Sequence, residues 1–209
     1  MSGIGRFIGL VAGLALTVAI SGHSASAASV AAAPSPVFET VAGLTSIPVG
    51  HAEFCAIHKR ECGPNAHVVE TVTLTQALWQ QLLDVNNAVN TNVKPVTDEV
   101  LYKVAEYWTY PHGYGDCEDY ALEKRRELMA LGWPASTLLM TVVRQQNGEG
   151  HAVLTVRTDR GDLILDNQEG LVRLWDDTPY RYLKRQSQAN SADWVAIVDN
   201  RAATVIATR

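Results

Sequence analysis

The spacing of apolar residues predicts three helices in the middle of the chain. Apolar side chains recur every three or four positions over residues 74–91, as in an amphipathic helix. A second helix is expected after Thr97, which suits an N-cap, with an apolar stripe that runs to Trp108. A third is expected from Asp116 to Leu131, because Gly132 and Pro134 are helix stop signals.

Beyond residue 137 the pattern changes to that of strands. Residues 138–144, 152–158 and 163–167 are rich in β-branched and other apolar residues, and Arg160-Gly161 marks a turn between the last two. Helices followed by strands joined through short turns indicate an α+β fold, with N-terminal helices packed on an antiparallel sheet.

The N-terminus has the parts of a secretory signal peptide. Arg6 precedes an apolar run that is too short to span a bilayer, and Ala25-Ser26-Ala27 forms a cleavage site. We therefore expect a signal peptide over residues 1–28, a flexible lead-in over 29–36 and a single domain over 37–209. The expected location is periplasmic or secreted, and a retained N-terminal anchor is the alternative.

The charge of the chain argues against nucleic acid as a partner. The formal net charge is −5, and removal of the signal peptide takes away Arg6 and no acid, which gives −5 − 1 = −6. A mildly acidic domain without a basic stretch is a poor match for nucleic acid or for anionic lipid.

Three cysteines in an exported protein leave one thiol unpaired. Cys55 and Cys62 are close in sequence and lie next to a turn signal at Gly63-Pro64, so a disulfide between them is expected. The alternative is a zinc site in which both thiols join one of three nearby histidines, but the spacing matches no common zinc pattern. Those histidines are His51, His58 and His67.

Pairing those two leaves Cys117 as the free thiol, at the start of the third expected helix. Unpaired N–H groups and the positive end of the helix dipole favour the thiolate there. The alternative is a small buried cysteine that happens to begin a helix.

The two strands after residue 150 bring a histidine and a carboxylate together. If Leu154 and Leu165 face the same core, His151 and Asp166 both lie on the other face of the hairpin. Asp166 then lies opposite Val153 and diagonal to His151, roughly 7–8 Å away, within reach of the imidazole. A solvated strand-end histidine and an ordinary turn acid are the alternatives.

These three residues have the chemistry of a nucleophilic triad. A thiolate needs a base that takes its proton and later protonates the leaving amine, and that base needs a partner that fixes its tautomer. We predict Cys117 as nucleophile, His151 as base and Asp166 as the orienting group. The Cys117 backbone N–H is expected to be one oxyanion donor, and the sequence does not identify the second.

Three stretches together resemble the bacterial transglutaminase-like cysteine peptidases. They are Gly115–Ala121, Gly150–Leu154 and Leu165–Asn167, and the resemblance extends from about Phe54 to Trp194. It implies a papain-like, transglutaminase-like fold and the same triad. The family includes LapG-type periplasmic proteases, which cut large surface adhesins near paired alanines and release biofilm cells. The resemblance therefore implies a protein substrate such as an adhesin, and it allows an inner-membrane receptor for a cyclic dinucleotide as regulator.

Acidic residues surround the nucleophile: Asp116, Glu118 and Asp119. Helix capping explains one or two of them, but their charge raises the pKa of a neighbouring thiol. A hard cation would cancel that penalty. The resemblance implies calcium bound by Asp116 and Glu118, whereas Asp119 is left as a helix cap.

Two other functions stay open at this point. The same triad performs acyl transfer to an amine in a transglutaminase or amidase, since the acylation step is shared. A catalytically silent binding module would be expected to carry a damaged triad, and this one is intact.

Overall fold

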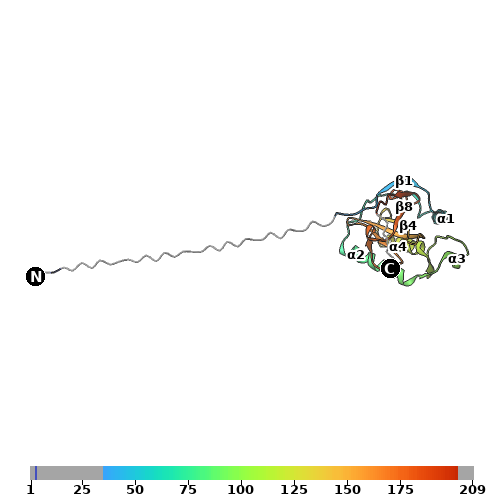
Figure 1. Cartoon of the computed structure of the whole chain (residues 1–209), viewed down its shortest axis with the longest axis horizontal. Helices are drawn as coiled ribbons and strands as arrows, with labels where there is room; N and C mark the ends of the chain where they lie inside the picture. The colour runs from blue at the N-terminus through green and yellow to red at the C-terminus, as the bar shows by residue number, and fades with distance from the viewer. Residues whose placement is uncertain (1–2, 4–34, 202–209) are drawn as a thin grey trace. The chain divides into compact units, whose positions relative to one another are not determined.

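A computed structural model describes residue 3 and residues 35–201 of the chain (Figure 1). The expected signal peptide lies outside the described residues apart from Gly3, and so does the lead-in apart from residues 35–36. Residues 35–201 belong to a single compact unit. In this part of the chain no helix has both the length and the apolar character required to cross a bilayer.

The fold is built on a seven-stranded antiparallel sheet with the order β1-β9-β8-β4-β5-β6-β7. Its middle is formed by the strands that the sequence predicted. The strands are β1 (Val41–Thr45), β4 (Leu138–Arg144), β5 (Gly150–Thr158), β6 (Gly161–Leu165), β7 (Arg173–Leu174), β8 (Arg181–Gln186) and β9 (Trp194–Ile197). A separate parallel pair joins β2 (Lys94–Pro95) to β3 (Tyr114–Gly115).

The helices α1 (Val49–Ile57), α2 (Gln76–Asn92), α3 (Asp98–Leu101) and α4 (Cys117–Ala130) precede most of the sheet in the chain. Short 3-10 turns cover Ala135–Thr137 and Trp175–Asp177. Helix α4 packs against β5 on one side and against α2 on the other. Figure 1 shows α4 in the middle of the folded unit and α3 at its periphery. This is the predicted α+β arrangement of helices on an antiparallel sheet.

Both faces of the sheet are covered. The larger core lies between the helices and one face, where Leu82 of α2 and Leu122 of α4 meet Leu154 and Leu165. A smaller core covers the other face. It consists of Val143, Val153, Ile164, Trp175, Tyr182 and Ile197. Because both faces are covered, nearly every residue of β5 is buried, including the polar Thr155.

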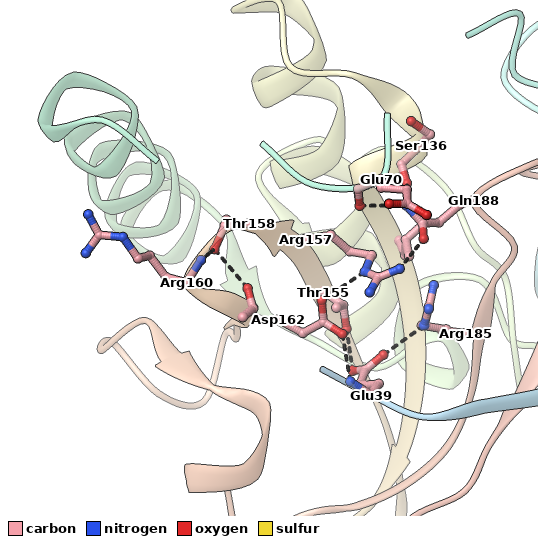
Figure 2. A network of polar contacts seen from close by, with 12 residues as sticks. Glu39, Glu70, Ser136, Thr155, Arg157, Thr158, Arg160, Asp162, Arg185 and Gln188 are labelled. Carbon is pink, nitrogen blue, oxygen red and sulfur yellow. Dashed lines mark hydrogen bonds and ion pairs between the residues drawn. The ribbon is translucent and has the colours of Figure 1, made fainter. Parts of the chain in front are cut away.

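A buried polar network attaches the segment before β1 to the sheet face away from α4 (Figure 2). The Glu39 carboxylate lies 2.9 Å from Arg185 and accepts a hydrogen bond from Thr155, while its backbone N–H donates to Asp162. Asp162 also accepts from Arg157 at 3.0 Å. Glu39, just before β1, is therefore held by polar contacts with three strands.

The predicted second helix is wrong in length. Helix α3 ends at Leu101, whereas the apolar stripe suggested that it continued to Trp108. The backbone N–H of Tyr107 donates to the Asp98 carboxylate, and that of Thr109 donates to the Asp119 carboxylate at 2.9 Å. Acidic side chains therefore take up N–H groups that a longer helix would have bonded internally.

Candidate active site

Cys117 is the first residue of α4 and faces a cavity of about 420 Å³. The N–H of Ala152, on β5, donates to its sulfur at 3.3 Å, so the packing of α4 on β5 fixes the position of the thiol. The same cavity is lined by His151. Its other lining residues are Pro48, Val49, Glu106, Trp108, Glu118, Val142, Gly150, Ala152 and Lys184.

His151 lies at the start of β5 and contacts Asp166. The register pairs Leu154 with Leu165, as the sequence predicted, and continuing it places Asp166 beside Val153. Nε2 of His151 lies 2.9 Å from Oδ1 of Asp166, and both side chains are almost fully buried. Because Nε2 is used in this contact, Nδ1 is the ring nitrogen left for chemistry. The Gln168 amide lies 3.5 Å from Nδ1.

The Asp166 carboxylate is held from several sides. The Gln168 backbone N–H donates to Oδ1 at 2.9 Å, and the Tyr180 hydroxyl donates to Oδ2. Burial alone would raise the pKa of Asp166, but the hydrogen bond and charge of His151, with the bonds from Tyr180 and Gln168, hold this pKa below its usual value. Asp166 is therefore an ionised acceptor that fixes the tautomer of His151.

Sequence reasoning missed Tyr180 and Gln168. The Tyr180 ring lies 5.4 Å from that of His151, so it contacts two members of the predicted triad. Its position in the chain gave no sign of this, because Tyr180 lies in a different segment from the hairpin of β5 and β6. The resemblance, which extends from about Phe54 to Trp194, covers Tyr180 but gave it no role.

A cluster of three acids lies beside the nucleophile. Carboxylate oxygens of Asp98, Asp116 and Glu118 lie within 4.8 Å of one another. Oδ1 of Asp98 and Oδ1 of Asp116 are buried and have no hydrogen-bond partner among the described residues. Burial, and then the charge of Asp116, raises the pKa of Glu118 to about 10. Buried, mutually repelling oxygens of this kind form a donor set suited to a hard cation such as calcium.

Asp98 was not among the residues predicted for this cluster. The sequence pointed to Asp116 and Glu118, which flank the cysteine, whereas Asp98 comes from α3 and meets them only in the folded chain. Asp119 lies outside the cluster and binds the N–H of Thr109.

The electrostatic surroundings of Cys117 differ from the prediction. A helix start favours a thiolate, but here burial, and then the charge of Glu118, raises the pKa of Cys117 well above its usual value. The Cys117 thiol donates to Glu118 at 3.2 Å. The helix start alone predicted a lowered pKa for Cys117. Next to these carboxylates, the pKa is raised instead.

Cys55 and Cys62 form the predicted disulfide, and Cys117 is the free cysteine. His51 lies 3.6 Å from the Cys55 sulfur. Both sulfurs are used in the disulfide, so no thiolate remains there for zinc, and the zinc alternative is wrong.

Comparisons with known proteins agree with this fold. Residues 41–202 match the family described as bacterial transglutaminase-like cysteine proteinase BTLCP. Calcium-bound LapG from Legionella pneumophila is 26% identical, with a TM-score of 0.50, and the match covers 62% of this chain and 75% of that one. EGTA-treated LapG from the same organism is 26% identical, with a TM-score of 0.48, and the match covers 60% of this chain and 69% of that one. No curated protein sequence gave a match.

A further LapG structure is 29% identical, with a TM-score of 0.46 over 52% of this chain. The chain spans 63% of the length of that protein. The family match covers most of this chain, including Cys117, His151 and Asp166. The chain therefore belongs to the bacterial transglutaminase-like cysteine proteinases.

Proposed function

We propose that this protein is an exported, calcium-dependent cysteine endopeptidase with Cys117, His151 and Asp166 as its catalytic triad. The observation that carries the proposal is the contact of His151 with Asp166 beside a cavity that Cys117 and His151 both line. A base held by a buried carboxylate next to a lone thiol is the arrangement that thiol-dependent acyl transfer requires.

Acylation begins when Nδ1 of His151 takes the Cys117 proton. The sulfur attacks the substrate carbonyl carbon, and the carbonyl oxygen becomes an oxyanion that the Cys117 backbone N–H stabilises. As the C–N bond breaks, His151 returns the proton to the leaving amine, and a thioester remains on Cys117. Asp166 stabilises the imidazolium in between.

Deacylation uses the same residues with water as the nucleophile. His151 removes a proton from water, the hydroxide attacks the thioester, and the thiol leaves with the proton from His151. An amine in place of water would give transamidation. Membership of a proteinase family supports hydrolysis as the main reaction.

Asp98, Asp116 and Glu118 would hold the calcium ion. Two of their buried oxygens lack a partner within the described part of the chain, which supports this donor set. When bound, the cation supplies positive charge that offsets the carboxylates around Cys117, and it fixes the start of α4 relative to α3. The similar LapG structure with a TM-score of 0.50 is calcium-bound.

The substrate is proposed to be a periplasmic or cell-surface protein such as an adhesin. The N-terminal signal pattern supports an exported location, and the resemblance to LapG-type proteases supports the adhesin class. The same resemblance supports an inner-membrane receptor as regulator.

Thiol labelling tests the triad and the cation together. The purified protein is treated with iodoacetamide near neutral pH, with calcium or with EGTA, and labelled peptides are mapped. We expect fast labelling of Cys117 with calcium, slow labelling with EGTA, and slow labelling in His151→Ala under both conditions. His67→Ala, which changes a histidine outside the cavity, is the matched control. A native Cys117 that reacts like a free thiol would overturn the proposal.

The substrate class requires a second assay. The protein and its Cys117→Ser variant are incubated with peptides derived from a bacterial proteome, with and without an added amine, and new termini are identified. New N-termini that depend on Cys117 support an endopeptidase. Amine incorporation without cleavage would identify a transamidase instead.

A further inference from the structure

Lys124 is a buried charged residue that the proposed reaction does not use. It lies on α4 about two turns after Cys117, on the same side of the helix. Its side chain is 0% exposed, and Nζ has no hydrogen-bond partner among the residues that the structure describes. Lysine is almost never fully buried unless it is paired, so this position requires an explanation.

The packing of α2 on α4 locates the Lys124 side chain. The Tyr120 hydroxyl donates to the Val93 carbonyl at 2.6 Å, and the Trp133 indole donates to Gln81 at 2.9 Å. The start of α4 therefore meets the end of α2, and the segment just after α4 meets the first half of α2, so the two helices run antiparallel. One turn beyond the Tyr120 contact, Lys124 lies level with Asn90.

Asn90 connects this position to the triad. Its side-chain N–H donates to the backbone carbonyl of Asp166 at 2.8 Å. Its own Oδ1 is buried and has no donor within the described chain. A lysine with three donors and no acceptor thus lies at the level of an amide oxygen that needs a donor.

The electrostatics of Lys124 also connect it with Asp166. Burial lowers the pKa of Lys124 to about 7, and the negative charge of Asp166 counteracts this lowering. The charge of Asp166 raises the pKa of Lys124, whereas α2 contributes amides at this level. His151 contacts the other side of the same carboxylate.

We propose that Lys124 is a positioning residue whose ammonium group neutralises the buried charge of Asp166 and, with Asn90, holds Asp166 where it meets His151. It acts on the reaction only through Asp166. The inference rests on the proposed function, since its catalytic consequence requires the triad to be active.

Replacement by methionine separates this role from packing alone. Methionine fills a similar volume without charge, so it relieves the desolvation of the Lys124 ammonium group but leaves the charge of Asp166 uncompensated. Lys124→Met is therefore expected to fold with a lower melting temperature, and the folded variant is expected to lose activity. Lys124→Gln restores a donor without the charge, and exposed Lys59→Met is the matched control.

The pH dependence of Cys117 alkylation in calcium is the readout. Below pH 7, where Lys124 is charged, we expect Lys124→Met to react about tenfold more slowly than the native protein, because a misplaced Asp166 misplaces the base. Above pH 8 the native lysine is neutral and the two rates should converge. Lys124→Gln should lie between them, and Lys59→Met should match the native protein throughout.

The N–H proton resonance of the His151–Asp166 hydrogen bond gives a readout without chemistry. We expect Lys124→Met and Lys124→Gln to shift or broaden this signal, and Lys59→Met to leave it unchanged. If native Cys117 is reactive while both Lys124 variants keep the native rates, pH profile and resonance, the role of Lys124 is disproved and the protease proposal stands. If native Cys117 is inert, the protease proposal fails, and an unchanged resonance in both Lys124 variants would also disprove the effect of Lys124 on Asp166.

Discussion

At the level of single residues, Asp166 is the most constrained side chain of the site. It accepts hydrogen bonds from His151, Tyr180 and the Gln168 backbone, and Asn90 holds its carbonyl. These contacts do not have equal roles. The bond with His151 sets the tautomer of the base, whereas the bond with Tyr180 restrains the carboxylate from behind. Their removal should therefore have effects of different size.

Asp166→Asn is expected to lower kcat/KM by more than about a hundredfold, because an amide in this place can donate to His151 and stabilise the wrong tautomer. Tyr180→Phe removes one hydrogen bond and should cost about tenfold or less, in line with roughly 1 kcal/mol for such a bond. Peptide hydrolysis by both variants checks this order. Equal losses would mean that Tyr180 acts directly on the substrate or on His151.

A second prediction at the residue scale concerns His51. This side chain is buried against Trp194, whose indole N–H donates to Nδ1 at 3.1 Å, and against the Gln186 amide at 3.0 Å. Burial lowers the pKa of His51 to about 4 from 6.5. Nδ1 must stay unprotonated to accept the Trp194 indole N–H, so a second ring proton there would break this hydrogen bond.

The unfolded chain therefore binds more protons than the folded protein between about pH 6.5 and 4. The free energy of unfolding should fall as the pH drops through this window, by up to about 1.4 kcal/mol per pH unit from this residue. His51→Gln should be less stable at pH 7 but should show a flatter acid dependence in urea titrations from pH 7 to 4. An equally steep loss in this variant would show that other groups cause it.

At the level of elements, α3 contributes one buried acid, Asp98, to a cluster whose other two members lie at the start of α4. Asp98 meets Asp116 and Glu118 because the pairing of β2 with β3 brings the start of α3 beside the start of α4. Asp98→Asn removes one charged ligand and should abolish most of the calcium-dependent rise in melting temperature. For the native protein, calcium at a hundredfold excess over Kd stabilises by about 2.7 kcal/mol.

Glu99→Gln is the matched control, because Glu99 is an exposed acid on the same short helix. Melting curves of both variants, with calcium and with EGTA, check the prediction. A full calcium response in Asp98→Asn would show that the cation is held elsewhere.

The elements that the sequence predicted well are those with a clear period. The helices α2 and α4 and the strands β4, β5 and β6 have regular apolar spacing and turn signals. The hairpin register followed from the leucines on β5 and β6, and it brought His151 to Asp166. The local sequence pattern therefore predicted how His151 and Asp166 lie relative to each other on the hairpin.

Other elements were hidden by tertiary contacts. Strand β8 reads as polar, Arg-Tyr-Leu-Lys-Arg-Gln, but Arg185 is buried because Glu39 pairs with it from a distant segment. Helix α1 has little amphipathic pattern, since its buried residues include Gly50 and His51. The contacts of Asp98 and Tyr180 and the burial of Lys124 likewise depend on segments far away in the chain, which no local spacing reveals.

At the level of the whole molecule, the network around Glu39 fastens the start of the domain to its central strands (Figure 2). Glu39 and Arg185 are both buried and lie 2.9 Å apart, although their atoms are not aligned as a hydrogen bond. Burial, and then the charge of Asp162, raises the pKa of Glu39, whereas Arg185 counteracts this shift. Burying the two charges costs desolvation energy, and the attraction between Glu39 and Arg185 offsets part of that cost.

Removing one partner should therefore cost more than removing both. Glu39→Leu leaves the Arg185 charge buried without its carboxylate and should lower the free energy of unfolding by about 3–5 kcal/mol. Glu39→Leu combined with Arg185→Met replaces the pair with apolar side chains and should recover most of that loss. Urea unfolding of the two single variants and the double variant measures the coupling. Because the network lies on the sheet face away from α4, the labelling rate of Cys117 should stay native in every variant that folds. Additive losses would show that the two charges are stabilised separately, Glu39 by the Thr155 hydroxyl and Arg185 by the charge of Asp162 and the Gln186 carbonyl.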